Sequence, residues 1–101
     1  MPVGIVLVHG AFRGGWAWDL VAEPLREAGL AVAAPTLTGC EPGSSRVGSR
    51  VRLSEWVQDV VDAVASLDIG DRKVLLVGHS QGGLVTTASG TALGGRLGGF
   101  L

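Results

Sequence analysis

The sequence predicts an α/β protein of three layers, in which helices flank both faces of a short parallel sheet of about three strands. Short apolar segments rich in β-branched residues alternate along the chain with segments whose apolar residues recur at helical spacing. The resulting order of strand and helix, repeated three times, favours parallel pairing through right-handed crossovers. A chain of 101 residues can form one small domain with a single core.

The first half of the chain predicts two strands and one helix. Residues 4–8 are almost entirely apolar and indicate a buried strand. Apolar residues at helical spacing predict a helix from about 16 to 28, in which Pro24 indicates a kink or a late start. Gly29 is placed to end this helix, and residues 30–34 indicate a second, weaker strand.

The second half begins with a polar loop and continues with the strongest helical pattern. Residues 36–52 are longer than an ordinary connection, which indicates a functional or mobile loop. One apolar stripe predicts a helix over 53–69, and residues 73–77 predict a third buried strand. A last helix from about residue 81 is expected to fade quickly, because threonine, serine and glycine are poor helix formers.

The motif Gly-His-Ser-Gln-Gly at residues 78–82 directly follows the third predicted strand. A serine between two such glycines, at a turn from strand to helix, is typical of a nucleophile elbow. The turn raises the serine hydroxyl above the sheet edge, close to main-chain amides that can stabilise an oxyanion. Ser80 is therefore the candidate nucleophile. We exclude His79 as its base, because adjacent side chains at a strand end point to opposite sides.

The end of the first strand is expected to lie beside this motif. If the first strand lies between the other two, His9-Gly10 and the elbow face each other where the strand order reverses. Ligands bind at that point in open α/β sheets. Asp59, Asp62 and Asp68, in contrast, are interpreted as solvating charges on or near an exposed helix.

Composition excludes several other classes of function. The net charge of −1 and the lack of a basic cluster argue against nucleic acid and membrane partners. The glycine spacing contains neither a dinucleotide-binding nor a phosphate-loop motif, and the two histidines and single cysteine show no metal-ligand pattern. Cys40 cannot form an internal disulfide, and the first apolar run is too short for a signal peptide, so we expect a cytoplasmic protein.

Several segments together resemble the α/β-hydrolase superfamily, and the branch of small esterases and hydroxynitrile-lyase-like proteins most. The resemblance extends over about residues 3–85 and is carried by residues 6–11, 14–18, 35–39, 56–61 and 77–83. It implies a partial α/β-hydrolase fold, with residues 1–85 as the N-terminal half of the domain. It also implies ester or similar acyl hydrolysis without a cofactor, with Ser80 as nucleophile and the backbone N–H groups of Ala11 and Gln81 as oxyanion donors. His9 would then order the oxyanion loop.

One departure from the family pattern is important. The family places its acid and its catalytic histidine after later strands, and no segment here corresponds to them. We therefore expect the chain to be catalytically incomplete, residues 86–101 to be a glycine-rich tail that is truncated or altered, and the third strand to form an exposed edge open to self-association. Two alternatives stay open: a non-catalytic remnant or small-molecule-binding module, and an acyltransferase or hydroxynitrile lyase.

Overall fold

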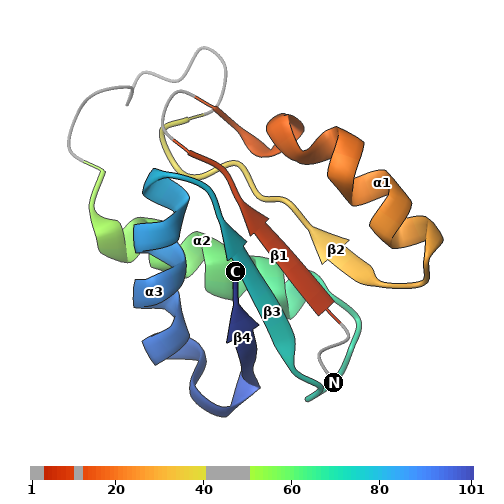
Figure 1. The fold of residues 1–101 in the computed structure, drawn as a ribbon. Helices are drawn as coiled ribbons and strands as arrows, with labels where there is room; N and C mark the ends of the chain where they lie inside the picture. Colours follow the sequence, from red (N-terminus) through yellow and green to blue (C-terminus); the bar gives the residue numbers. More distant parts are fainter. Residues whose placement is uncertain (1–3, 11–12, 41–50) are drawn as a thin grey trace.

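The computed structural model describes residues 4–10, 13–40 and 51–101. Its centre is a four-stranded sheet in which every neighbouring pair of strands is parallel (Figure 1). The strands are β1 (Gly4–Val8), β2 (Ala31–Ala33), β3 (Val74–Gly78) and β4 (Leu97–Phe100), in the spatial order β2-β1-β3-β4. The predicted fold class is confirmed, and so is the position of the first strand between the other two predicted strands.

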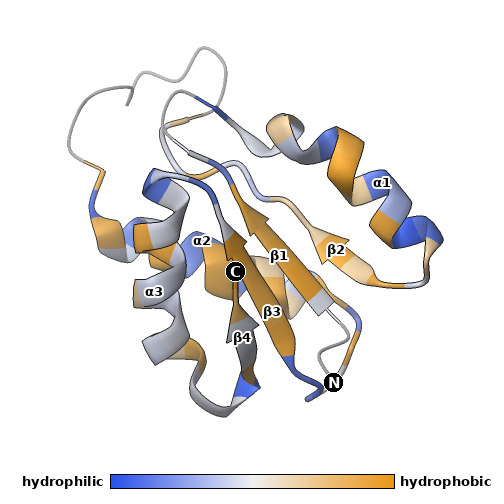
Figure 2. Cartoon of the chain, in the orientation of Figure 1, coloured by the Kyte–Doolittle hydropathy of each residue, from blue (hydrophilic) through white to orange (hydrophobic). Residues whose placement is uncertain are grey.

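Three helices cover the two faces of this sheet. Helix α1 (Asp19–Glu27) lies on one face, while α2 (Leu53–Ser66) and α3 (Gln81–Leu93) lie on the other (Figure 1). Alternate residues of β1 face the two layers, since Leu7 packs with the α1 side and Val6 and Val8 pack with the α2–α3 side. Both β1 and β3 are apolar along nearly their whole length, as expected for strands covered on two faces (Figure 2).

The first α-helix begins about three residues later than predicted, and Pro24 lies inside it. Residues Gly15–Trp18 form a single 3-10 turn (η1), and the α-helix follows it at Asp19. The helix ends at Glu27, and Gly29 just beyond it adopts φ +93°, a conformation that favours glycine. There the N–H of Gly29 donates to Arg26 O and the N–H of Leu30 to Leu25 O, the two bonds of a Schellman motif.

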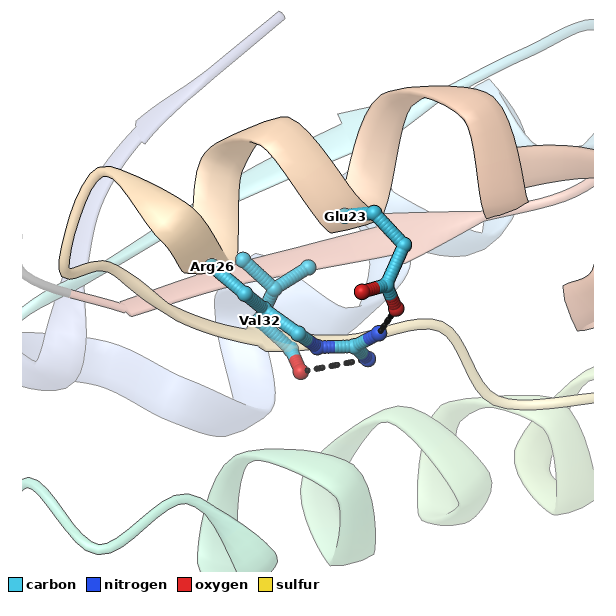
Figure 3. Close-up of polar contacts among 3 residues, drawn as sticks. All are labelled: Glu23, Arg26 and Val32. Atoms are coloured by element: carbon cyan, nitrogen blue, oxygen red, sulfur yellow. Dashed lines mark hydrogen bonds and ion pairs between the residues drawn. The ribbon is translucent and has the colours of Figure 1, made fainter.

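One side chain of α1 also contacts an edge strand of the sheet. The guanidinium of Arg26 donates from Nη2 to the carbonyl oxygen of Val32 in β2 at 3.1 Å, and from Nη1 to Glu23 at 3.0 Å (Figure 3). An edge strand carries main-chain groups that could pair with another chain. The contact therefore occupies one carbonyl of β2 within the molecule.

Helix α2 ends three residues earlier than its apolar pattern indicated. It stops at Ser66, and Leu67 is extended with ψ 128°. The extended residue lets Ile69 turn into the core, where it is only 4% exposed. The apolar stripe thus continued beyond the helix because the following turn is buried as well. Gly70, with φ +63°, completes that turn.

The prediction of a fading last helix is wrong, because α3 continues to Leu93. Its poor helix formers are small residues that allow close packing on α2 and the sheet. Ser89 is fully buried, and its hydroxyl is satisfied by a 2.7 Å bond to Val85 O within the helix. A Cβ at Gly90 would collide with the ring of Phe100 in β4. Tertiary packing therefore stabilises a helix that propensity alone does not favour.

The strand count and the position of the sheet edge also need correction. The sequence indicated about three strands, but β4 pairs with β3, so β3 is not an edge. The N–H of Leu101 donates to Leu76 O at 2.8 Å, which extends this pairing past the end of β4. Residues 86–101 therefore form the end of α3, a 3-10 turn (Gly94–Arg96, η2) and a strand. Within the described part of the chain, no helix is long and apolar enough to cross a membrane.

Candidate active site

Ser80 occupies a sharp turn between β3 and α3. Strand β3 ends at Gly78 and α3 begins at Gln81, so only two residues connect them. The backbone of Ser80 has φ 57° and ψ −121°, and no other non-glycine residue in the described ranges has a positive φ. Such a conformation is strained in an L-residue and persists only where its surroundings enforce it. The residue is exposed at the carboxyl end of the sheet.

Main-chain contacts hold this turn in place. The N–H of His79 donates to Val8 O at 3.1 Å, which ties the turn to the end of β1. The amides of Gly82 and Gly83 donate to the carbonyls of His79 and Ser80, both at 2.9 Å. A Cβ at Gly82 would overlap the carbonyl oxygen of Val8, so only glycine lets α3 start this close to β1.

The ends of β1 and β3 meet, as the motif spacing indicated. A Cβ built on Gly10 would lie 3.1 Å from the carbonyl oxygen of His79 and 3.2 Å from Cβ of Ser80. These distances are shorter than ordinary contacts to a side chain. The absence of a side chain at Gly10 therefore allows the loop after β1 to pass directly beside Ser80.

Of the two predicted oxyanion donors, Gln81 and Ala11, only Gln81 lies within the described residues. Gln81 is the first residue of α3, so its N–H is one of those that a helix leaves without an intrahelical partner. The next two amides donate to the carbonyls of the turn, whereas the N–H of Gln81 donates to no other described residue. Ala11 lies outside the described residues. Its neighbour Gly10 is the last described residue on that side of the gap.

His9 is buried beside this turn and is fully engaged with the main chain. Its Nε2 accepts a hydrogen bond from the N–H of Leu37 at 3.0 Å. The network therefore assigns the ring proton to Nδ1, which lies 2.8 Å from the carbonyl oxygen of Gly10 and donates to it. At 2% exposure and with both nitrogens bonded, His9 orders the loop after β1. This agrees with the structural role implied by the family resemblance.

The interpretation of Asp59 as a solvating charge is wrong, because its carboxylate bonds to another segment of the chain. Asp59 accepts from both the N–H and the hydroxyl of Thr38, at 2.7 to 3.0 Å. The sequence pattern placed Asp59 correctly on the polar side of a helix. It could not indicate that a turn 21 residues earlier would approach that side. Among the described residues, the carboxylate of Asp62 accepts one hydrogen bond, from the side-chain amide of Gln58 at 2.8 Å, and its side chain is exposed.

A cavity of about 250 Å³ opens beside the turn. It is lined by residues of both strand ends and of the first helical segment: His9, Gly10, Arg13, Ala17, Trp18, Val21 and His79. Sequence reasoning did not single out Arg13, since one arginine in a glycine-rich loop forms no pattern. The buried Nε1 of Trp18, which also lines the cavity, has no acceptor in the described part of the chain. In the same residues, no group of three potential ligands is arranged to bind a metal ion.

Known proteins resemble this chain in sequence. A carbendazim hydrolyzing esterase of Nocardioides sp. (strain SG-4G) is 43% identical over 82 residues, which cover 81% of this chain and 33% of that protein. A putative chloroplastic methylesterase 11 of Arabidopsis thaliana is 41% identical over 78 residues, covering 77% of this chain and 20% of that protein. The chain thus spans a third or less of the length of these relatives.

A solved structure and a family model agree with this resemblance. A pyrethroid hydrolase from Sphingobium faniae JZ-2 is 30% identical and superposes with a TM-score of 0.86, covering 99% of this chain and 38% of that one. The model of the alpha/beta hydrolase family matches residues 5–101, which include α3 and β4 as well as the turn at Ser80. This chain therefore belongs to the alpha/beta hydrolase family.

Proposed function

We propose that this chain carries the nucleophile of a serine hydrolase that acts on an ester or a similar acyl substrate. The observation that carries the proposal is the backbone of Ser80, which has a positive φ at an exposed turn between a buried strand and a helix. A strained serine between two glycines at a turn from strand to helix is the geometry typical of a nucleophile elbow, which supports the proposal. The esterases and hydrolases among the relatives support an acyl substrate.

The proposed reaction begins with attack of the Ser80 Oγ on the acyl carbon. The carbonyl oxygen becomes an oxyanion, which the N–H of Gln81 stabilises, together with the N–H of Ala11. One such donor is worth about 3 kcal/mol of transition-state stabilisation. Collapse of this intermediate breaks the bond to the alkoxy oxygen, which leaves as the alcohol with the proton released from the Ser80 hydroxyl. Water then attacks the remaining acyl-serine ester, which releases the carboxylic acid and restores the Ser80 hydroxyl.

We further propose that the isolated 101-residue polypeptide reacts slowly, because it lacks a suitable base for Ser80. It contains only two histidines. Both ring nitrogens of His9 are bonded to the main chain, and the ring of His79, the residue before Ser80, makes no hydrogen bond to the Ser80 hydroxyl. Loss of the histidine and acid of a serine triad lowers the rate by about 10⁴- to 10⁶-fold.

A fluorophosphonate probe tests both statements. After long incubation, peptide mass spectrometry is expected to find the label on Ser80 and not on Ser54 or Ser66, which are exposed serines of α2. Added imidazole should accelerate labelling of Ser80, because it supplies the missing base from solution. Ser80→Ala should remove the imidazole-dependent signal.

Three results would contradict the proposal. Label spread equally over the three serines would show that Ser80 has no special reactivity. Complete labelling of Ser80 within minutes without imidazole would show that a base is already present. No labelling of Ser80 even with imidazole would instead favour a non-catalytic binding module of the same fold.

A further inference from the structure

We propose that Asp59 is a positioning residue for the candidate active site. From α2, its carboxylate holds Thr38 in the turn that follows β2. Leu37 of the same turn bonds to the ring of His9, and this ring bonds to the main chain at Gly10. The inference rests on the proposed function, because the loop in question would carry the oxyanion donor Ala11. The contacts themselves are independent of whether Ser80 reacts.

The first step is the clamp between Asp59 and Thr38. The N–H of Thr38 donates to Oδ2 of Asp59 at 2.7 Å, and its hydroxyl lies 2.8 and 3.0 Å from the two carboxylate oxygens. Trp56, one turn earlier on α2, donates from Nε1 to the carbonyl oxygen of Thr38 at 2.9 Å. Hydrogen bonds to a carboxylate are among the stronger ones in proteins. Helix α2 therefore holds the main chain of Thr38 on both sides.

The second step leads from Thr38 to the preceding residue. Because Asp59 holds the N–H of Thr38, the peptide bond between Leu37 and Thr38 has a set orientation. The N–H of Leu37 belongs to the preceding peptide, which is joined to the held one through Leu37 itself, and it donates to Nε2 of His9, 3.0 Å away. Leu37 is also one of the largest fully buried side chains, so it cannot rotate freely to compensate for a loss of this clamp.

The third step connects His9 to the active-site loop. Since Nε2 accepts from Leu37, the proton resides on Nδ1 and is donated to the carbonyl oxygen of Gly10. Gly10 in turn lies directly beside Ser80. A continuous series of hydrogen bonds and backbone links thus connects a helix carboxylate to the loop that faces the nucleophile.

Asp62 provides a matched control on the same helix. It lies three residues further along α2, carries the same charge, and makes its contact with a neighbouring exposed side chain. Replacing either residue by alanine removes one carboxylate from α2. Only the loss of Asp59 is expected to affect His9 and Leu37.

The test uses the full 101-residue chain labelled with ¹⁵N. In the unaltered protein, the ring nitrogens of His9 should give one protonated (Nδ1) and one unprotonated (Nε2) signal, and the Leu37 amide should exchange slowly with solvent. In Asp59→Ala we expect exchange of the Leu37 amide to become at least about tenfold faster, as for the loss of one hydrogen bond. The His9 signals should move toward a mixture of tautomers. Asp62→Ala should leave both readouts unchanged.

A second variant covers the case in which Asp59→Ala does not fold. Asp59→Asn keeps the shape and one acceptor oxygen, so a smaller change in the same direction is expected. Unchanged His9 and Leu37 signals in the folded variants would overturn the inference. If those signals stay unchanged while the fluorophosphonate selects Ser80, positioning fails and the function stands. If they change while the probe does not select Ser80, the function fails and positioning stands.

Discussion

Replacing Gly82 by alanine is expected to destabilise the protein by about 2 kcal/mol, although alanine favours helices. The new Cβ would overlap Val8 O and lie 2.8 Å from His9 O. Both are main-chain atoms at the end of β1, so no side chain can rotate away to make room. The start of α3 would have to separate from β1, and the turn at Ser80 would lose its close packing.

The magnitude follows from two opposing terms. Inserting a methyl group into a well-packed site costs about 1–3 kcal/mol, and a clash with main chain argues for the upper end. Alanine in place of glycine stabilises a helix by up to about 1 kcal/mol. The difference is about 2 kcal/mol, which lowers the melting temperature of a domain of this size by about 8–16 °C.

Gly83→Ala is the matched control, because a Cβ there would meet no atom within 4 Å. It is expected to be neutral or to stabilise the protein by up to about 1 kcal/mol. Urea unfolding, followed by tryptophan fluorescence, gives the free energy of unfolding of both variants from their midpoints at constant m value. If Gly82→Ala and Gly83→Ala unfold at the same urea concentration, the steric account of the turn is wrong.

Two further predictions concern the core and the sheet edge. Leu76→Ala, at a fully buried position of β3, should lower the free energy of unfolding by about 2–5 kcal/mol. Leu84→Ala, at a position of α3 that is 61% exposed, should change it by less than about 0.5 kcal/mol in the same unfolding experiment. We also expect self-association through β4, since no strand in the described part of the chain pairs with its outer side. Sedimentation velocity should then show a mass that rises with protein concentration, and Gly98→Lys, at an exposed position of this strand, should reduce the rise; a mass that stays monomeric at every concentration would contradict the expectation.

The main elements of the sheet could be predicted from the sequence because burial on two faces leaves a direct signature. An apolar run such as that of β1 or β3 is too short for a helix and too continuous for an exposed strand. The turn at Ser80 was predictable because glycines two residues on either side of a serine let neighbouring main chain pass close, and a Cβ at Gly78 or Gly82 would collide with main-chain atoms.

The part of the fold after the turn at Ser80 was not predictable in this way. In α3 the serines, threonines and glycines signal weak helix propensity, and the same residues permit close contact with β4 and α2. Whether such residues end a helix or let it pack closely depends on which segments lie against it, and the sequence pattern does not contain that information. The two glycines of β4 likewise have low strand propensity, so the sequence pattern did not indicate a strand there.

Local pattern by itself thus determined the alternation of strands and helices, the parallel sheet and the strained serine at its carboxyl edge. Only the tertiary structure decided how far α3 extends, that β4 covers β3, and that Asp59 contacts Thr38. The physical reason is the range of the interactions. Backbone propensity and burial periodicity act between near neighbours in sequence, whereas these contacts join segments that come together only when the sheet and its two helical layers have formed.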